Sequence, residues 1–407
     1  MTTTTSELVT KAKAARAASR ELRKLPTGVK NAALEAIAKA LEQEQGPIHE
    51  ANAQDMQAGK ESGLNEALLD RLLLNEARLK SMASDVRNVA SLPDPIGETF
   101  DGHNLANGIR VERRRVPLGV IGTIYESRPN VTVDISVLCL KSGNAAVLRG
   151  GKEAIHSNKA LITLVRNALE SAGVTPEAVQ FVNDTDRAVV DEMIRLDEYI
   201  DLIIPRGGEG LIKYVAANAT VPAITGGVGV VHAYVDASAD PAKAADIVFN
   251  AKVQRPTVCN ALDTLLMHSA AAPATLPDIA SRLTAAGVEM RCDQRALSLL
   301  GPINEQYIKA AKPEDFGQEF LSLVLSVRVV DSIDEAIEHI ETHGSGHSEA
   351  IITEDYSAAT RFVDEVEAAV VLVNASTRFN DGAQLGLGAE VAISTNKLHA
   401  RGPMGLR

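Results

Sequence analysis

The chain has 407 residues, which is enough for two or three domains, each with a core of its own. Aromatic residues make up 3% of the chain and its net charge at pH 7 is −12, which argues against nucleic-acid binding by base stacking or through a general phosphate-binding surface. Three widely separated cysteines form neither a disulfide framework nor a zinc site, and no apolar run approaches the roughly 20 residues of a membrane span. We therefore expect a cytoplasmic protein that binds neither nucleic acid nor membranes.

The first 92 residues carry a helical pattern, because apolar side chains recur at three- and four-residue spacing over 8–22 and 29–41. Asn75 is a predicted N-cap for a helix through Val89. The Leu92-Pro93-Asp94-Pro95 sequence ends this region. Beyond it, the dipeptide Asn107-Gly108 predicts a β-hairpin over 104–116.

Strand and helix patterns then alternate. Strands are predicted at 116–125, 145–149, 179–182, 202–205, 221–224 and 228–235, with helices at 154–172 and 186–196. A second series has strands at 259–268, 321–330, 349–353 and 369–374, with helices at 241–254, 276–286, 333–341 and 357–367. Such alternation predicts parallel sheets covered by helices on both faces. The glycine-rich and polar residues 376–407 predict an arm that packs elsewhere.

Asn130 is the first candidate functional residue. It follows a predicted strand and opens a predicted helix that ends near Lys141. An amide close to a helix N-terminus can donate to a developing oxyanion, helped by the positive end of the helix. The alternative is a plain helix cap.

Two strand ends are candidates for holding a nucleotide. Arg149 and Lys152 follow a buried strand, and a basic group there suits a ribose or its 2′-phosphate. Gly207 and Gly208 close another strand and precede a helix, so a pyrophosphate could approach their backbone amides. Neither segment is a full G-x-G-x-x-G motif, and ordinary strand exits remain the alternative.

Cys259 lies after a predicted helix, at the start of a predicted apolar strand. A thiol placed there can be both exposed and positioned, and a thiolate is a strong nucleophile toward acyl carbons. A buried small apolar residue is the alternative interpretation. The four-residue spacing of His339, His343 and His347 resembles a metal-binding helix face, but Gly344 and Gly346 would interrupt that helix. We therefore predict no metal site.

These motifs occur in the order typical of the aldehyde dehydrogenase superfamily, which the chain resembles over nearly its whole length. Val116–Ile121 is similar to the P-x-G-V strand of that superfamily, Gly143–Arg149 to its G-N-x-x-V-L-K segment, and Pro205–Gly208 to its Phe-Thr-Gly-Ser turn. Within the superfamily the chain resembles the gamma-glutamyl phosphate reductases. This finer resemblance rests on residues 125–132, 147–152, 259–262 and 397–403.

The resemblance implies an α/β fold of the aldehyde dehydrogenase type, with two parallel-sheet domains. The cofactor-binding domain would comprise 1–103 and 117–231, and the catalytic domain 232–375. A hairpin at 104–116 and the arm 376–407 would bridge subunits in a dimer or in a tetramer built from dimers.

The resemblance also implies a reaction, the NADPH-dependent reduction of L-glutamyl 5-phosphate to L-glutamate 5-semialdehyde in proline biosynthesis. Cys259 falls on the catalytic thiol of the superfamily, which would form a thioester as phosphate leaves. Asn130 falls on the amide of its Pro-Trp-Asn segment and would bind the oxyanion together with the backbone N–H of Cys259.

Further roles follow from the same resemblance. Arg149 and Lys152 would lie at the 2′-phosphate of NADPH, Gly207 and Gly208 near its pyrophosphate, and Glu319 on its nicotinamide ribose. The substrate phosphate and α-carboxylate need cations, for which the candidates are Arg128, Arg378, His399 and Arg401. Each of these could equally pair with a protein carboxylate. Glutamate 5-kinase is a candidate partner, because it would supply the labile acyl phosphate.

One departure from the superfamily's motifs narrows the possible reactions of the thioester. Hydrolytic members of the superfamily carry Glu-Leu-Gly-Gly, in which the Glu activates water against the thioester, whereas this chain has Ile224-Thr225-Gly226-Gly227. Ile224 cannot act as a base, which favours exchange of the thioester with phosphate over hydrolysis. Two alternatives remain open, a hydrolytic aldehyde dehydrogenase and a non-catalytic binding relative.

Overall fold

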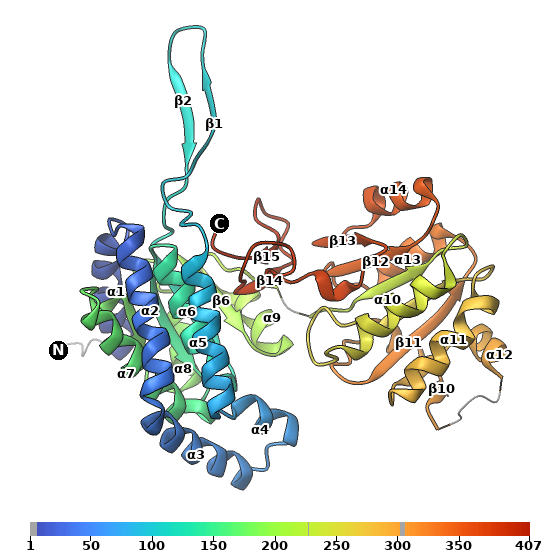
Figure 1. The fold of residues 1–407 in the computed structure, drawn as a ribbon, viewed down its shortest axis with the longest axis horizontal. Coiled ribbons are helices and arrows are strands. Elements are labelled where there is room, and N and C mark those ends of the chain that lie inside the picture. Colours follow the sequence, from blue (N-terminus) through green and yellow to red (C-terminus); the bar gives the residue numbers. More distant parts are fainter. Residues whose placement is uncertain (1–5, 227, 302–305) are drawn as a thin grey trace. The chain divides into compact units, whose positions relative to one another are not determined.

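The computed structural model describes residues 6–226, 228–301 and 306–407, so Gly227 of the predicted glycine turn lies outside the described residues. These residues form two compact units. The first runs to Thr225 and also contains residues 387–392 and 404–407. The second contains Gly226–Gly386 and Ile393–Pro403 (Figure 1).

The first unit begins with five helices, as the apolar spacing predicts. They are α1 (Glu7–Leu22), α2 (Thr27–Gln43), α3 (Gln45–Glu61), α4 (Glu66–Leu72) and α5 (Glu76–Ser91). The predicted cap is confirmed, because the side chain of Asn75 accepts a hydrogen bond from the Arg78 N–H at 2.9 Å. The buried faces of α1, α2 and α5 join one continuous hydrophobic core with the sheet that follows.

That sheet has four parallel strands in the order β5-β4-β3-β6. The strands are β3 (Val120–Tyr125), β4 (Ala145–Gly150), β5 (Val179–Phe181) and β6 (Leu202–Arg206). The remaining helices of this unit are α6 (Asn130–Lys141), η1 (Lys152–Ala154), α7 (Ile155–Ser171), η2 (Pro176–Ala178), α8 (Arg187–Met193) and α9 (Glu209–Asn218). β3 and β4 are buried throughout, as expected for strands covered on both faces.

The strand predicted at 221–224 is wrong. This segment forms only an isolated bridge, in which Ile203 pairs with Ala223. Pro222 has no N–H, so it can accept a bond from the Ile203 N–H but cannot continue a ladder. The strand predicted from Val116 likewise begins later, at Val120, after Pro117 and after Gly119 with a φ of +129°.

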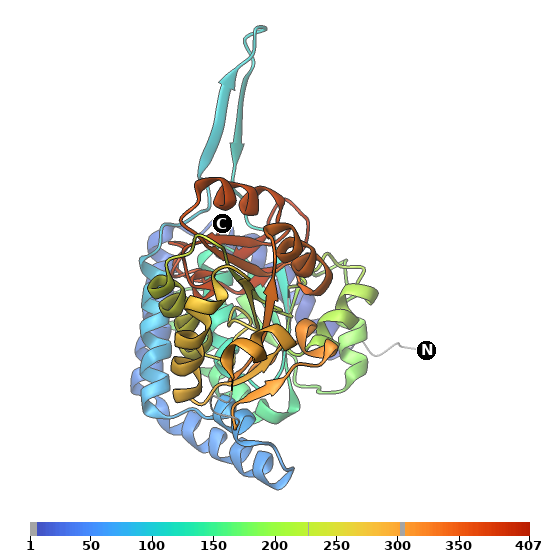
Figure 2. The same ribbon diagram turned by 90° about the vertical axis from the view of Figure 1, so that its right-hand side faces the viewer.

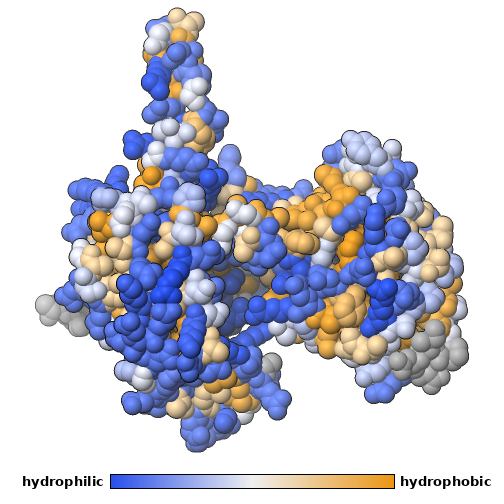
Figure 3. All heavy atoms as spheres, viewed as in Figure 1, coloured by the Kyte–Doolittle hydropathy of each residue, from blue (hydrophilic) through white to orange (hydrophobic). Residues whose placement is uncertain are grey.

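A hairpin extends from the first unit (Figures 1 and 2). Its strands, β1 (Thr99–Asn104) and β2 (Arg110–Arg114), pair antiparallel around the predicted Asn107-Gly108 turn, although β1 starts five residues earlier than expected. Neither strand contains a buried residue. Phe100, Leu105 and Ile109 are exposed on it, and apolar patches are visible among its polar residues in Figure 3.

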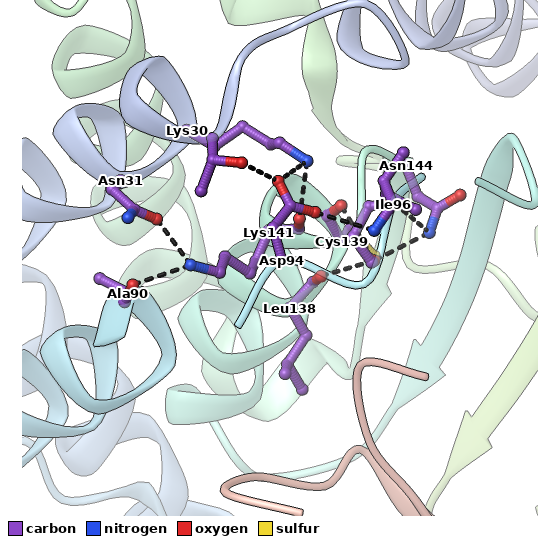
Figure 4. A network of polar contacts seen from close by, with 11 residues as sticks. Lys30, Asn31, Ala90, Asp94, Ile96, Leu138, Cys139, Lys141 and Asn144 are labelled. Atoms are coloured by element: carbon purple, nitrogen blue, oxygen red, sulfur yellow. Dashed lines mark hydrogen bonds and ion pairs between the residues drawn. The ribbon is translucent and has the colours of Figure 1, made fainter. Parts of the chain in front are cut away.

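A buried polar network fixes the end of α6 in the first unit (Figure 4). The Lys30 Nζ lies 2.6 Å from the Asp94 carboxylate and donates to the carbonyl of Lys141, the last residue of α6, at 3.1 Å. Lys141 is itself buried and donates to Asn31 at 2.6 Å and to the Ala90 carbonyl at 2.8 Å. The Lys30 ammonium lies at the negative end of the α6 dipole and so stabilises the helix that Asn130 begins, whereas the Lys141 ammonium lies at the corresponding end of α5.

The second unit contains a sheet of seven parallel strands in the order β10-β9-β11-β8-β7-β12-β13. The strands are β7 (His232–Val235), β8 (Thr264–His268), β9 (Glu289–Cys292), β10 (Ile308–Ala310), β11 (Val324–Val330), β12 (Ser348–Ile352) and β13 (Val370–Val373). Both faces are apolar. One face carries Ala233, Leu265 and Ala350, and the other carries Tyr234, Leu266 and Ile351.

Helices cover both faces of this sheet, so the predicted α/β fold is confirmed. One face packs against α10 (Pro241–Val253), α11 (Ala272–Ala285) and α12 (Gln294–Leu300), and the other against α13 (Ile333–His343) and α14 (Tyr356–Glu365). The segment after β13 holds η4 (Thr377–Phe379), β14 (Ala392–Ser394) and β15 (Gly402–Met404), and η3 (Pro313–Gly317) precedes β11. Throughout the described residues, no helix is both long enough and apolar enough to cross a bilayer.

Candidate active site

Cys259 lies in a turn between α10 and β8, so the prediction that it starts a strand is wrong: β8 begins only at Thr264. Ala261 and Leu262 are buried without being part of a strand, which explains the apolar pattern there. Cys259 is partly exposed, whereas Cys139 and Cys292 are buried. Burial raises the pKa of both buried thiols to about 12. Cys259 is therefore the thiol that solvent and a substrate can reach.

Two distant segments meet at the backbone of Cys259. Gly229 packs so closely on it that a Cβ at position 229 would lie 1.7 Å from the Cys259 carbonyl oxygen. The N–H of the same glycine donates to the Glu319 carboxylate at 3.0 Å. Glu319, the predicted ribose ligand, is thus linked to the backbone of Cys259 through one glycine.

The segment that carries Glu319 is fixed by buried charges. The Phe320 N–H donates to Asp263 at 3.0 Å, and the Lys252 ammonium lies 3.8 Å from the same carboxylate. Burial raises the pKa of Asp263 to about 7 and lowers the pKa of Lys252 to about 8. Leu321 has a φ of +50°, which is unfavourable for a residue with a side chain. Such strain persists only where the surroundings hold the backbone, and it is common at functional sites.

Asn260, the residue after Cys259, is 4% exposed and connects the turn to the segment that follows β13. Its Nδ2 donates to the Asn380 carbonyl at 2.9 Å, and its carbonyl accepts a bond from the Thr377 hydroxyl at 2.8 Å. Its Oδ1 accepts a bond from the Arg378 guanidinium. These three bonds hold Arg378 next to the turn of Cys259.

In the first unit, Asn130 is the first residue of α6. Its side chain does not cap that helix, because its Nδ2 donates to the Asp134 carboxylate at 2.8 Å. Burial raises the pKa of Asp134 to about 6, against the lowering effect of this hydrogen bond. Ser127, three residues earlier, has a φ of +38°, a second strained position next to a predicted site residue.

The two basic residues predicted for the 2′-phosphate differ in their surroundings. Arg149 is 8% exposed, and its Nη2 donates to the carbonyls of Thr185 at 2.5 Å and Asp186 at 3.3 Å. Burial lowers the pKa of its guanidinium. Lys152 is exposed at the first position of η1. Arg149 therefore holds the loop after β5, while Lys152 is accessible to a ligand.

Gly207 and Gly208 connect β6 to α9, as predicted, and Gly208 is the N-cap of that helix. The Glu126 carboxylate accepts a hydrogen bond from the Gly208 N–H at 2.9 Å. A Cβ at Gly207 would lie 2.6 Å from a Glu126 oxygen. An anionic group thus already lies at the amide predicted for a pyrophosphate. Sequence reasoning missed Glu126, which lies 82 residues from Gly208.

The four substrate candidates are divided between the two units. Arg128 belongs to the first unit, and the other three belong to the second. Arg401 and Lys397 both pair with Glu367, and the Lys397 distance is 3.2 Å. His399 is exposed between them in the sequence. Arg378 is the candidate whose contacts lead to the turn of Cys259.

The histidines that resemble a metal site are spread over two elements. α13 ends at His343, and His347 follows the break at Gly344. His339 Nδ1 lies 3.0 Å from the Arg328 guanidinium, and His347 Nδ1 lies 2.7 Å from the Ser348 hydroxyl. In the described part of the chain, no group of three or more His, Cys, Asp or Glu side chains is placed to hold a metal ion.

Because His339 and His347 are buried, we predict that the stability of the fold decreases in acid. Burial lowers the pKa of His347 to about 4, and burial together with nearby cations lowers that of His339 to about 2. An unfolded histidine binds a proton near pH 6.5, so between pH 6.5 and 4 the unfolded chain binds more protons than the folded chain. We expect each buried histidine to remove about 3 kcal/mol of stability over this window.

Urea unfolding at several pH values measures this loss, with His347→Asn as the test variant. Asparagine keeps a polar group for Ser348 but does not titrate. Below pH 6.5 the free energy of unfolding of the variant should therefore depend less steeply on pH, by the equivalent of about one proton. An unchanged pH dependence in the variant would contradict the prediction.

Comparison with known proteins yields consistent matches. The profile of the aldehyde dehydrogenase family matches residues 1–312 and 312–389. A gamma-glutamyl phosphate reductase of Dehalococcoides mccartyi is 54% identical over 401 residues, covering 98% of this chain and 95% of the relative. The crystal structure of a gamma-glutamyl phosphate reductase from Thermotoga maritima has a TM-score of 0.94 at 47% identity, covering 98% and 96%. An engineered glycolyl-CoA reductase with bound NADP+ shares the fold at 18% identity, with a TM-score of 0.69 and coverage of 98% and 94%.

Proposed function

Since the chain belongs to the aldehyde dehydrogenase family and is an oxidoreductase of the gamma-glutamyl phosphate reductase type, we propose that it reduces L-glutamyl 5-phosphate to L-glutamate 5-semialdehyde and releases phosphate. The accessible thiol of Cys259, with its backbone packed on Gly229 and linked through it to Glu319, is the observation that carries the proposal. The reaction serves proline biosynthesis, and we propose a cytoplasmic location for it.

The chemistry of the proposal begins at Cys259. Its thiolate attacks the acyl carbon, a C–S bond forms, and the C–O bond to phosphate breaks with the electron pair leaving on phosphate. The phosphate is a weakly basic leaving group, so this step needs little general acid catalysis. The backbone N–H of Cys259 and the amide of Asn130 stabilise the oxyanion, for which Asn130 must turn from Asp134.

A nicotinamide cofactor is common to this family, and we propose NADPH. When bound, it supplies the hydride that reduces the thioester to the aldehyde. Several features of the first unit fit a dinucleotide. Lys152 is accessible for the 2′-phosphate, and position 207 has no room for a Cβ. Arg149 supports the adjoining loop. Glu126 must release the Gly208 amide before a pyrophosphate can accept its hydrogen bond.

Phosphate dependence tests the proposal directly. In the oxidative direction, with glutamate 5-semialdehyde, NADP+ should be reduced only when phosphate or arsenate is present, because Ile224 cannot activate water. Oxidation without either anion would establish the hydrolytic alternative instead. Parallel kinetics with NAD+ decide the cofactor preference.

The exposed hairpin supports a homo-oligomer, a dimer or a tetramer built from dimers. Its strands present unpaired edges and the apolar side chains of Phe100, Leu105 and Ile109 to solvent, which proteins avoid unless a partner covers them. We also propose glutamate 5-kinase as a transient partner, because the acyl phosphate that it would deliver is labile in water.

Removal of the hairpin should give a monomer. Replacing residues 99–114 by a short glycine-serine linker removes the exposed apolar surface without touching the core, so the chain should fold but dissociate. Light scattering after size exclusion measures the mass. The matched control, Lys152→Ala, also changes an exposed residue and should keep the mass of the unmodified protein. An unchanged mass without the hairpin would place the subunit contact elsewhere.

A further inference from the structure

A pocket of about 350 Å³ lies between α10 and the segment that follows β13, within the second unit. It is lined by Asp246, Asn250 and Gln254 on one side and by Arg378, Phe379 and Asp381 on the other. These side chains are polar or charged apart from Phe379, and Ile247 and Ala375 add apolar surface to the lining. Such a lining suits a small ligand with several ionised groups.

Both sides of the pocket are joined to the turn of Cys259. α10 leads directly into that turn, and Gln254, its C-cap, lies five residues before Cys259. On the other side, the Arg378 guanidinium and the Thr377 hydroxyl donate to Asn260, and the Asn260 amide donates to the carbonyl of residue 380, so this segment is fixed to Asn260. A ligand in the pocket is therefore held on the framework that positions the thiol.

The pocket carries one positioned cation and one positioned carboxylate. Arg378 supplies the cation, held by its bond to Asn260. Asp381 supplies the carboxylate, whose Oδ1 accepts bonds from the Ala383 N–H at 2.9 Å and the Gln384 N–H at 3.3 Å. Asp246 differs, because its side chain is 75% exposed and pairs with Arg282 at 2.7 Å. The positioned pair complements a zwitterion.

We propose that this pocket binds the α-amino acid end of the substrate, with Arg378 on the α-carboxylate and Asp381 on the α-ammonium group. The assignment rests on the proposed function. In glutamyl phosphate two methylene groups separate the α carbon from the carbonyl that the thiol attacks, so the amino acid end must bind close to Cys259. Planar guanidinium groups suit carboxylates, and an aspartate suits an ammonium group.

The test combines two kinds of change. Each protein variant loses one charge of the pocket, and each substrate analogue lacks the group that would pair with one of those charges. Arg378→Gln and Asp381→Asn are assayed in the phosphate-dependent oxidation of glutamate 5-semialdehyde, glutarate semialdehyde and 4-aminobutanal. Glutarate semialdehyde lacks the α-ammonium group, and 4-aminobutanal lacks the α-carboxylate. Asp278→Asn is the matched control, since it removes a carboxylate that also pairs with Arg282, at 3.0 Å, but does not line the pocket.

Asp381→Asn should lower kcat/KM for glutamate 5-semialdehyde about 10- to 100-fold and change that for glutarate semialdehyde little. Arg378→Gln should lower kcat/KM for both of those substrates by a similar factor and should change kcat/KM for 4-aminobutanal little. Asp278→Asn should match the unmodified protein with all three substrates.

Two results would overturn the assignment. Equal losses with all three substrates would mean that Arg378 and Asp381 only support the fold near Cys259, and no loss would mean that the amino acid end binds elsewhere. Either result, with phosphate-dependent activity in the unmodified protein, leaves the proposed function standing. Absence of that activity from the unmodified protein would overturn the proposed function, and this assignment with it.

Discussion

Replacement of Cys259 by alanine should lower the rate of glutamyl phosphate reduction by at least about 10⁴-fold, because no other group can form the thioester. Cys139 and Cys292 cannot substitute for it, since both are buried and burial raises the pKa of each to about 12. The same variant should bind the cofactor normally. Steady-state kinetics and a cofactor titration by fluorescence separate the two effects.

A second measurement isolates the acyl transfer step. Mixed with glutamyl phosphate and no cofactor, the unmodified protein should release one phosphate per active site quickly as the thioester forms, and Cys259→Ala should release none. Cys292→Ala is the matched control, because it removes a buried thiol of β9 and should retain the burst. A burst in Cys259→Ala would refute the thioester, and a wild-type protein without turnover would support the binding-protein alternative.

The alternation of strands and helices could be predicted from the sequence because buried parallel strands and amphipathic helices leave strong periodic patterns. Some of the shortest elements, such as β9, β10 and α12, were not predicted, since few positions carry a pattern there. The turn of Cys259 was taken for a strand because Ala261 and Leu262 are apolar and buried. Side-chain bonds at Asn260 hold that turn, and apolar periodicity does not report them.

The contacts of the candidate site are less predictable than its residues. Cys259, Asn130 and Glu319 were predicted because their segments resemble motifs of the aldehyde dehydrogenase superfamily in the same order. Glu126 was not, because its hydrogen bond to Gly208 joins two strand ends 82 residues apart. The sequence pattern does not distinguish Gly229 from the chain's other glycines. Only the structure shows why position 229 must lack a side chain, because the backbone of Cys259 fills the space that a Cβ would occupy.

Gly229→Ala should lower kcat by about 100-fold although it removes none of the proposed reacting groups. The added Cβ would lie 1.7 Å from the Cys259 carbonyl oxygen, far inside van der Waals contact, so the turn of Cys259 must move. A displacement of about 1 Å at a nucleophile costs about 10²-fold in rate, because attack requires close alignment. The movement also strains the bond from the Gly229 N–H to Glu319. Single-turnover phosphate release measures the effect on the acyl transfer step.

Two glycines provide controls that separate displacement of the thiol from general instability. At Gly344 a Cβ would lie 2.5 Å from the Ile340 carbonyl oxygen, at the end of α13, so Gly344→Ala should lower the melting temperature with little change in kcat. At Gly28, in the first turn of α2, nothing lies within 4 Å of an added Cβ, so Gly28→Ala should keep kcat and keep or raise stability. If Gly229→Ala keeps kcat within about threefold of the unmodified protein, below the loss expected for a displaced nucleophile, then close packing on Gly229 does not position Cys259.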